Sequence, residues 1–187
     1  MEALLVSAAV VALAEIGDKT QLLALVLAAR FRAPLPVILG ILTATLANHF
    51  AAGWVGTLLA AAVRPSVMRW VLALSFFAAA AWMFIPDREP EARTRPGRFG
   101  AYGTTVVSFF LMEIGDKTQL ATVALAAKYQ ALIPVVAGTT LGMLLADVPA
   151  VLLGEAAASR IPIGLVNRLA AAAFLVLGLL VLLRAPG

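Results

Sequence analysis

Long apolar stretches, separated by short polar breaks, run through the whole chain. A helix needs roughly 20 mostly apolar residues to cross a hydrocarbon core about 30 Å thick. On this criterion we predict transmembrane helices over residues 3–29, 34–62, 66–86, 101–127, 131–157 and 162–183. The pattern therefore predicts an all-α, polytopic membrane protein with six transmembrane helices.

One clearly hydrophilic segment, residues 87–100 (DREPEARTRPGRFG), lies between the third and fourth predicted spans. Proline, glycine and mixed charges are typical of a surface linker. The segment divides the chain into a first three-helix half, residues 1–86, and a second, residues 101–187.

Composition supports a membrane protein over a soluble one. Hydrophobic residues make up 63% of the chain and charged residues 13%, with a mean hydropathy of +1.00, whereas soluble domains have about 25% charged residues. The 14 Lys and Arg residues are spread thinly and form no basic stripe, so we expect no nucleic-acid partner in spite of a pI near 10.1. The partner that this composition implies is the lipid bilayer.

Basic residues are distributed unevenly between the two sides of the predicted membrane. Loops on the linker's side carry eight arginines, and loops on the other side carry four Lys or Arg residues. Cytoplasmic loops carry the excess of Lys and Arg. We therefore predict that the linker is cytoplasmic and that both termini lie outside.

The sequence contains a long internal repeat. Residues 15–22 (EIGDKTQL) recur letter for letter as residues 113–120, at an offset of 98, and further matches follow downstream at the same offset. Because each half has an odd number of spans, the halves should insert with opposite orientations. Such inverted repeats are typical of secondary transporters, whose substrate sites lie near the bilayer midplane. Each motif begins about 18 Å into its span, so the two motifs should meet there.

Each motif would place two acids and an amide on one face of a continuous helix. These residues are Glu15, Asp18 and Gln21 in the first motif, and Glu113, Asp116 and Gln119 in the second. Lys19 and Lys117 each follow the glutamate of their own motif by four residues, an order that favours an ion pair. We expect both lysines to set the local charge.

The charge of the paired motifs predicts a competition between metal and protons. With all groups ionised, each motif carries one net negative charge, so a divalent cation or two protons would neutralise the pair. Four crowded carboxyl groups cannot all stay ionised without a cation. Metal entry should therefore expel protons, and protonation should expel the metal, which amounts to proton-coupled exchange.

The expected ligands are the carboxylate oxygens of the motifs, with the amide oxygens of Gln21 and Gln119 as possible helpers. Such hard oxygen ligands suit Mn²⁺, Ca²⁺ or Mg²⁺. Gly17 and Gly115 stand between the two acids of each motif. They could allow a local break in the helix or the close approach of a neighbouring helix, and the sequence leaves both open.

Three further polar residues lie inside predicted spans. Under the offset of 98, Asn48 and His49 align with Ala146 and Asp147. We expect Asp147 near the site as a ligand or proton relay, because acids inside a membrane are expensive and usually functional. Asn48 is either an amide beside the ligands or an interhelical hydrogen-bond donor, and His49 is more typical of a packing residue.

The doubled E-x-G-D-[KR]-[TS] motif, on the first and fourth predicted spans, resembles that of the Gdt-one-like family of divalent cation/proton antiporters. This family includes bacterial manganese exporters and the Golgi manganese/calcium transporter. The resemblance covers nearly the whole chain and implies exchange of Mn²⁺, often also Ca²⁺, for protons. It implies that the acids at positions 15, 18, 113 and 116 bind the metal, with no permanently bound cofactor and no enzymatic activity. The short linker resembles compact prokaryotic members and implies the cell membrane.

Our hypothesis is thus a proton-coupled antiporter that exports Mn²⁺ from the cytoplasm. The nearest alternative is Ca²⁺/H⁺ exchange, since the two ions share ligand types. A non-transporting scaffold is a rival from another class, as is an intramembrane aspartyl protease using Asp18 and Asp116. The protease signature G-x-G-D would need glycine at positions 15 and 113, where this chain has glutamate. The sequence leaves the oligomeric state open, a homo-oligomer included.

Overall fold

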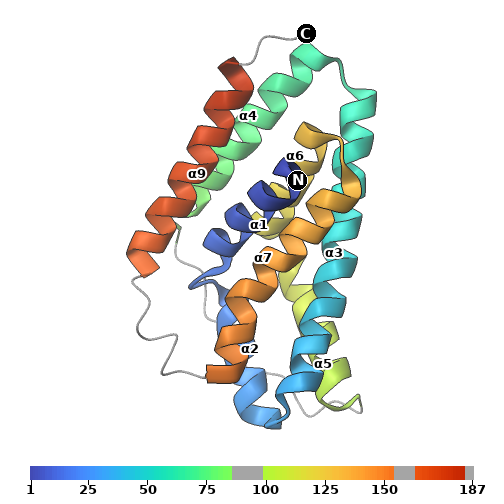
Figure 1. Cartoon of the computed structure of the whole chain (residues 1–187), viewed down its shortest axis with the longest axis vertical. Helices are drawn as coiled ribbons and strands as arrows, with labels where there is room; N and C mark the ends of the chain where they lie inside the picture. The colour runs from blue at the N-terminus through green and yellow to red at the C-terminus, as the bar shows by residue number, and fades with distance from the viewer. Residues whose placement is uncertain (86–98, 154–162, 184–187) are drawn as a thin grey trace.

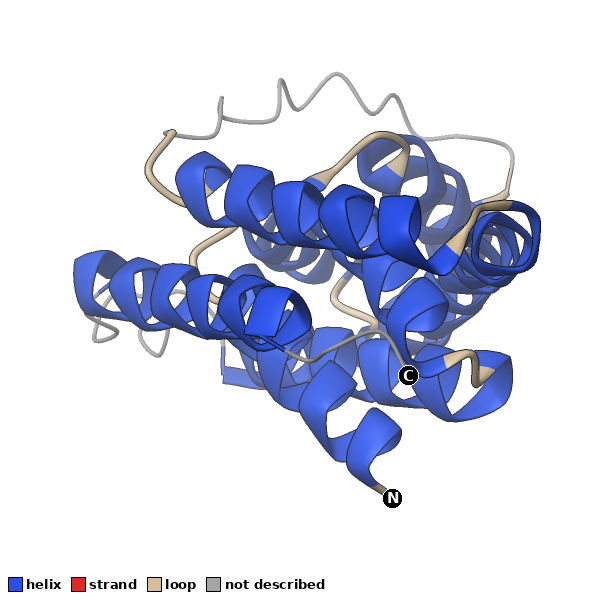
Figure 2. Ribbon diagram, turned by 90° about the horizontal axis from the view of Figure 1, so that it is seen from above, coloured by secondary structure: helices blue, strands red, loops and turns tan. Residues whose placement is uncertain are grey.

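The structure, a computed structural model, describes residues 1–85, 99–153 and 163–183. These residues form eight helices and no strand (Figures 1 and 2). The helices are α1 (Glu2–Glu15), α2 (Lys19–Phe31), α3 (Pro34–Ala62), α4 (Pro65–Trp82), α5 (Gly100–Glu113), α6 (Lys117–Tyr129), α7 (Leu132–Leu153) and α9 (Ile163–Leu183). The described part of the chain is thus helical, as predicted, while most of the predicted linker, residues 87–98, lies outside it.

Four of these helices, α3, α4, α7 and α9, are long and apolar enough to cross a membrane. They coincide with four of the predicted spans to within a few residues, and the α3 bounds agree at both ends. Large apolar side chains remain exposed on all four, among them Leu39, Leu74, Leu145 and Leu179. An apolar surface of this extent suits contact with lipid.

The other two predictions, continuous helices over residues 3–29 and 101–127, are wrong. Each of these segments consists of two shorter helices, α1 with α2 and α5 with α6, and each break falls inside the repeated motif. Gly17 and Gly115 adopt positive φ angles of 83° and 76°. This conformation ends a right-handed helix, and glycine adopts it without steric cost. The first of the two roles left open, a break in the helix, is therefore observed at both glycines, and at Gly17 a neighbouring helix also approaches closely through Ile163.

The broken helices of each half pack against the long helix of the other half. Helices α1 and α2 lie along α7, and helices α5 and α6 lie along α3. In Figure 1, α3 rises from the bottom of the view and α7 descends from the top. The contacts are close because they use small residues: a Cβ at Gly40 would lie 2.6 Å from Thr105 Cβ on α5, and one at Gly138 would meet the Leu4 carbonyl on α1.

Helices α4 and α9 pack against each other at one side of the molecule (Figure 1). Their contact includes Phe76 and Phe174, which are 98 residues apart and whose rings stack with centroids 6.5 Å apart. The ring of Phe77 lies against Gly178. Both helices bury about a third of their apolar span, against 61% for α7, so this pair lies at the periphery of the bundle.

Candidate metal centre

The two motif breaks share one backbone geometry. After each left-handed glycine, the aspartate is extended, with φ −80° and ψ 166° at Asp18 and φ −82° and ψ 165° at Asp116. In each motif the glutamate is therefore the last residue of one helix, and the aspartate is the N-cap of the next. The predicted polar stripe along a single helix is wrong, because the chain changes direction between the two acids.

The surroundings of the two glycines differ, which gives a testable difference in stability. An alanine at Gly115 has no heavy atom within 4 Å of its Cβ, whereas an alanine at Gly17 places its Cβ 2.8 Å from Ile163 Cγ2. We expect Gly115→Ala to lower the free energy of unfolding by about 1–2 kcal/mol, the cost of a left-handed non-glycine residue. Gly17→Ala should cost about 2–3 kcal/mol, because overpacking is added.

Denaturant unfolding of both variants in detergent measures this difference. The double variant Gly17→Ala/Ile163→Ala should return the loss to the level of Gly115→Ala, because it removes the overlapping side chain. Equal losses in the two single variants would show that the side chain at position 163 gives way without cost.

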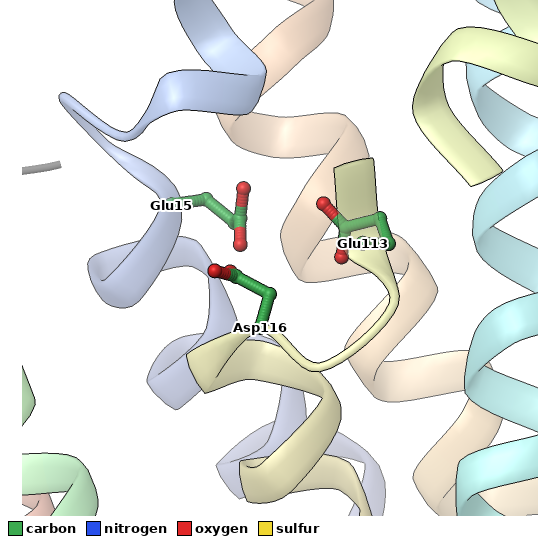
Figure 3. Close-up of side chains that lie close together, drawn as sticks. All are labelled: Glu15, Glu113 and Asp116. Carbon is green, nitrogen blue, oxygen red and sulfur yellow. The ribbon is translucent and has the colours of Figure 1, made fainter. Parts of the chain in front are cut away.

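Three carboxyl groups converge where the motifs meet. Glu15, Glu113 and Asp116 each offer one oxygen, and these oxygens all lie within 4.8 Å of one another. Figure 3 shows the side chains pointing toward one another from the ends of α1 and α5 and the start of α6. Their exposed fractions are 0%, 0% and 2%. The structure thus brings the two motifs together, in a geometry that could hold a metal ion.

The lysines form ion pairs that cross between the motifs. Lys19 Nζ lies 2.7 Å from Asp116 Oδ1, and Lys117 Nζ contacts Asp18 Oδ1. The predicted pairing of each lysine with the glutamate of its own motif assumed an uninterrupted helix. Because that helix ends at the glutamate, each lysine instead begins a new helix that faces the other motif.

Motif threonines hold one oxygen of each glutamate. Thr20 Oγ1 donates a hydrogen bond to Glu15 Oε2 at 2.5 Å, and Thr118 Oγ1 donates to Glu113 Oε2 at 3.1 Å. The other oxygen of each glutamate, Oε1, is buried without a hydrogen-bond partner in the described part of the chain. These two oxygens are therefore oriented and available to a cation or a proton.

The glutamines fix the backbone of the breaks. Gln21 Oε1 accepts a hydrogen bond from the Gly17 amide at 3.0 Å, and Gln119 Oε1 accepts one from the Gly115 amide at 2.8 Å. The Gln21 side-chain amide also donates to the Ala146 carbonyl on α7, at 2.9 Å. Both glutamine oxygens thus serve the loop geometry that brings the acids together.

Asp147 adds a fifth acid to the centre. It is fully buried on α7, neither carboxyl oxygen has a hydrogen-bond partner within the described residues, and it interacts electrostatically with Glu15, Glu113 and Asp18. If all groups were ionised, the five carboxyl groups and two lysines would carry three net negative charges. Such a charge in a buried site requires compensation by cations or protons.

Asn48 and His49 lie on α3, facing the second half. The Asn48 side-chain amide donates a hydrogen bond to the Phe110 carbonyl in the last turn of α5, at 3.1 Å. The last carbonyl groups of a helix have no partner within the helix, and Asn48 supplies a donor to one of those of α5. His49 occupies the position equivalent to Asp147 and is fully buried, and its ring nitrogens have no hydrogen-bond partner among the residues described.

Two cavities adjoin residues of the motifs. One, of about 430 Å³, lies between α3, α4 and α6 and is lined by Gly115, Asp116 and Gln119. The other, of about 440 Å³, lies between the start of α2, the residues that follow α4 and the start of α9, and it reaches Lys19 and Lys117. The first cavity thus adjoins one acid of the cluster, and the second adjoins both paired lysines.

Comparison with known proteins found a matching family model and a related protein. A family model described as "Divalent cation/proton antiporter GDT1" matches residues 3–91 and 101–187, so that each matched segment contains one motif. The chain is 49% identical over 183 residues to a protein of Vibrio cholerae serotype O1 named "Putative manganese exporter"; the match covers 96% of this chain and 90% of that protein. No solved structure matches the chain.

Proposed function

Because the chain belongs to the GDT1 family of divalent cation/proton antiporters, we propose that its cargo is Mn²⁺, exported from the cytoplasm in exchange for protons. The observation that carries this proposal is the buried cluster of Glu15, Glu113 and Asp116, whose oxygens lie within 4.8 Å of one another. An all-oxygen donor set suits Mn²⁺ and also Ca²⁺. The name of the Vibrio cholerae relative favours Mn²⁺.

The family consists of transporters, which sets aside the aspartyl protease and the scaffold. We propose a transporter with six spans in two inverted three-helix repeats, residues 1–86 and 101–187, joined by a cytoplasmic linker at residues 87–100. In each repeat the first span is a broken helix, α1–α2 or α5–α6. Discontinuous helices near the midplane are a common way for transporters to build an ion site. The excess of arginines on the linker's side supports a cell-membrane orientation with both termini outside.

In this proposal the residues at the centre have distinct tasks. Glu15, Glu113 and Asp116 contact the metal, while Asp18 and Asp147 complete the negative charge around it. When the metal is absent, Lys19 forms an ion pair with Asp116 and Lys117 forms one with Asp18. Both ion pairs cross the interface between the two repeats. The side chains at positions 21, 48 and 119 hold the helix ends in place through their backbone hydrogen bonds.

Exchange follows from the charge of the centre. A buried site is most stable near zero net charge, so the empty centre retains about three protons. Mn²⁺ with one remaining proton gives the same total. The two states therefore differ by two protons for one Mn²⁺, with no net movement of charge.

We accordingly expect Mn²⁺ transport to be electroneutral. In proteoliposomes whose membrane potential is clamped with potassium and valinomycin, the rate of Mn²⁺ uptake at a fixed pH gradient should not change with the potential. The ratio of protons to Mn²⁺ should be 2. A rate that rises with a negative interior would show that net positive charge crosses with the metal, and that the neutrality argument fails.

The experiment that tests the function uses purified full-length chain in proteoliposomes. An imposed pH gradient should drive Mn²⁺ against its concentration gradient, and dissipating the gradient with a protonophore and nigericin should stop it. Parallel uptake of Ca²⁺ decides between the two cargoes, since a higher ratio of kcat to KM for Ca²⁺ would replace Mn²⁺ in the proposal. Absence of gradient-driven movement for both ions would overturn it.

A further inference from the structure

The α4–α9 pair sits unevenly on the two halves of the molecule. Helix α9 packs along α1, and helix α4 packs along α6. Under the offset of 98 the equivalent contacts would be α4 with α5 and α9 with α2, and in the described residues these are at most marginal. Figure 1 shows the same imbalance: the pair lies beside α1, while α2 and α5 stand clear of it at the bottom of the view.

Because of this uneven packing, the start of α9 covers the break at Gly17, whereas the break at Gly115 is uncovered. Ile163, the first residue of α9, lies so close to Gly17 that a Cβ there would be 2.8 Å from its Cγ2. The equivalent of Ile163 in the first half is Pro65, yet the space beside Gly115 is open to 4 Å and the neighbouring Ile114 is 55% exposed. Two breaks with the same backbone therefore have different surroundings.

The α4–α9 pair leaves α2 and α5 uncovered on the linker's side of the molecule. The cavity that reaches Lys19 and Lys117 is walled by residues 83–85, which follow α4, and by the start of α9. Residues 83–85 lead into the predicted linker, and α9 begins just after the loop between the fifth and sixth predicted spans. The sequence predicts that both of these connections lie on the linker's side. Lys19 is also the more exposed of the two paired lysines, at 21% against 5%. An ion arriving through this cavity would thus meet the ion pair that Lys19 forms with Asp116.

We infer that α4 and α9 form the moving part of the transporter, and that the structure is the state open toward the linker's side. In the opposite state the pair packs against α2 and α5, the start of α4 covers Gly115, and the start of α9 leaves Gly17. This inference rests on the proposed function, because it describes how that centre is exposed to one side at a time.

The repeat explains why two such states can coexist. Each contact made in one state has a counterpart, 98 residues away, that is made in the other, so the two states bury similar surfaces. Conformations that interconvert during function differ by only a few kcal/mol. The stacked rings of Phe76 and Phe174 lie within the pair, so the movement does not separate them.

Single cysteines test the inference directly, because the chain contains no cysteine of its own. Leu22 lines the cavity on the linker's side and Leu120, its equivalent, lines the other cavity. A membrane-impermeant thiol reagent applied from the linker's side, in vesicles of known orientation without divalent cation, should modify Leu22→Cys at least ~10-fold faster than Leu120→Cys, since minor states are populated at 10% or less. Asn167→Cys, in the same cavity as Leu22, should behave like Leu22→Cys.

Turnover supplies the second half of the test. During Mn²⁺ exchange, modification of Leu22→Cys from the linker's side should slow, and modification of Leu120→Cys from the opposite side should rise in parallel. A Leu120→Cys variant that reacts from the linker's side as fast as Leu22→Cys would overturn the inference, as would rates that do not change reciprocally. The unmodified chain and both variants are first assayed for Mn²⁺ transport. Absence of transport by the unmodified chain counts against the proposed function. Non-reciprocal labelling of variants that do transport Mn²⁺ counts only against the inference that α4 and α9 move.

Discussion

Glu15→Gln or Asp116→Asn is expected to reduce proton-driven Mn²⁺ transport to the background of protein-free vesicles. Each substitution keeps the size of the side chain but removes one negative charge from the centre. Loss of one partner from a buried charge contact costs ~3 kcal/mol, and 1.4 kcal/mol corresponds to a factor of ten. The affinity for the cation should therefore fall at least about 100-fold, and coupling to protons should be lost with it.

The measurement is the initial rate of Mn²⁺ uptake at a fixed pH gradient, together with the shift in melting temperature on adding Mn²⁺. Glu113→Gln, at the position equivalent to Glu15, should show the same loss. The matched control is Glu2→Gln, which removes an exposed acid at the start of α1 and should retain both transport and the melting shift. If Glu15→Gln or Asp116→Asn moves Mn²⁺ at the unmodified rate, the assignment of the centre is wrong.

Much of this centre could be predicted from the sequence because its two halves are copies. The identical residues 15–22 and 113–120 predicted that the acids meet, and the structure brings Glu15, Glu113 and Asp116 together. Asp147 was predicted to lie near them from its depth in an apolar span, and it interacts with three of the motif acids. Burying an acid in lipid is costly unless it joins such a site, which makes this signal strong.

The breaks in the first and fourth spans could not be derived from periodicity. Apolar residues continue on both sides of each motif, so a hydropathy pattern cannot distinguish one long helix from two short ones. A glycine fits the interior of a membrane helix and also the left-handed turn seen at Gly17 and Gly115. Only the packing of α2 and α6 against the opposite half determines which of the two occurs, and the crossed lysine pairs follow from that choice.

The uneven position of α4 and α9 was also beyond the sequence, for a different reason. An inverted repeat predicts equivalent contacts for both halves, yet α9 packs on α1 while α4 has no comparable contact with α5 in the described residues. A repeated sequence specifies which contacts are available in either half. It does not specify which of these contacts the structure makes.

The crossed ion pairs lead to the second prediction with a large effect, on stability in the absence of divalent cations. Lys117 and Asp18 are both almost fully buried, with side-chain exposures of 5% and 0%, whereas Lys19 is 21% exposed. Removing one partner of a buried pair leaves an uncompensated charge, which costs about 3–5 kcal/mol before protonation relieves part of it. We expect Lys117→Met to lower the free energy of unfolding by about 3 kcal/mol, and Lys19→Met to lower it by about 1 kcal/mol because water screens that pair better.

Denaturant unfolding in detergent with a chelator measures both losses, and a double-mutant cycle isolates the pair. Lys117→Met/Asp18→Asn should recover more than half of the loss seen in Lys117→Met, because the unpaired charge is gone. The control is Lys117→Met/Asp116→Asn, which leaves Asp18 ionised and should recover less. Equal recovery in the two double variants would show that the lysine acts through the overall charge of the centre and not through its contact with Asp18.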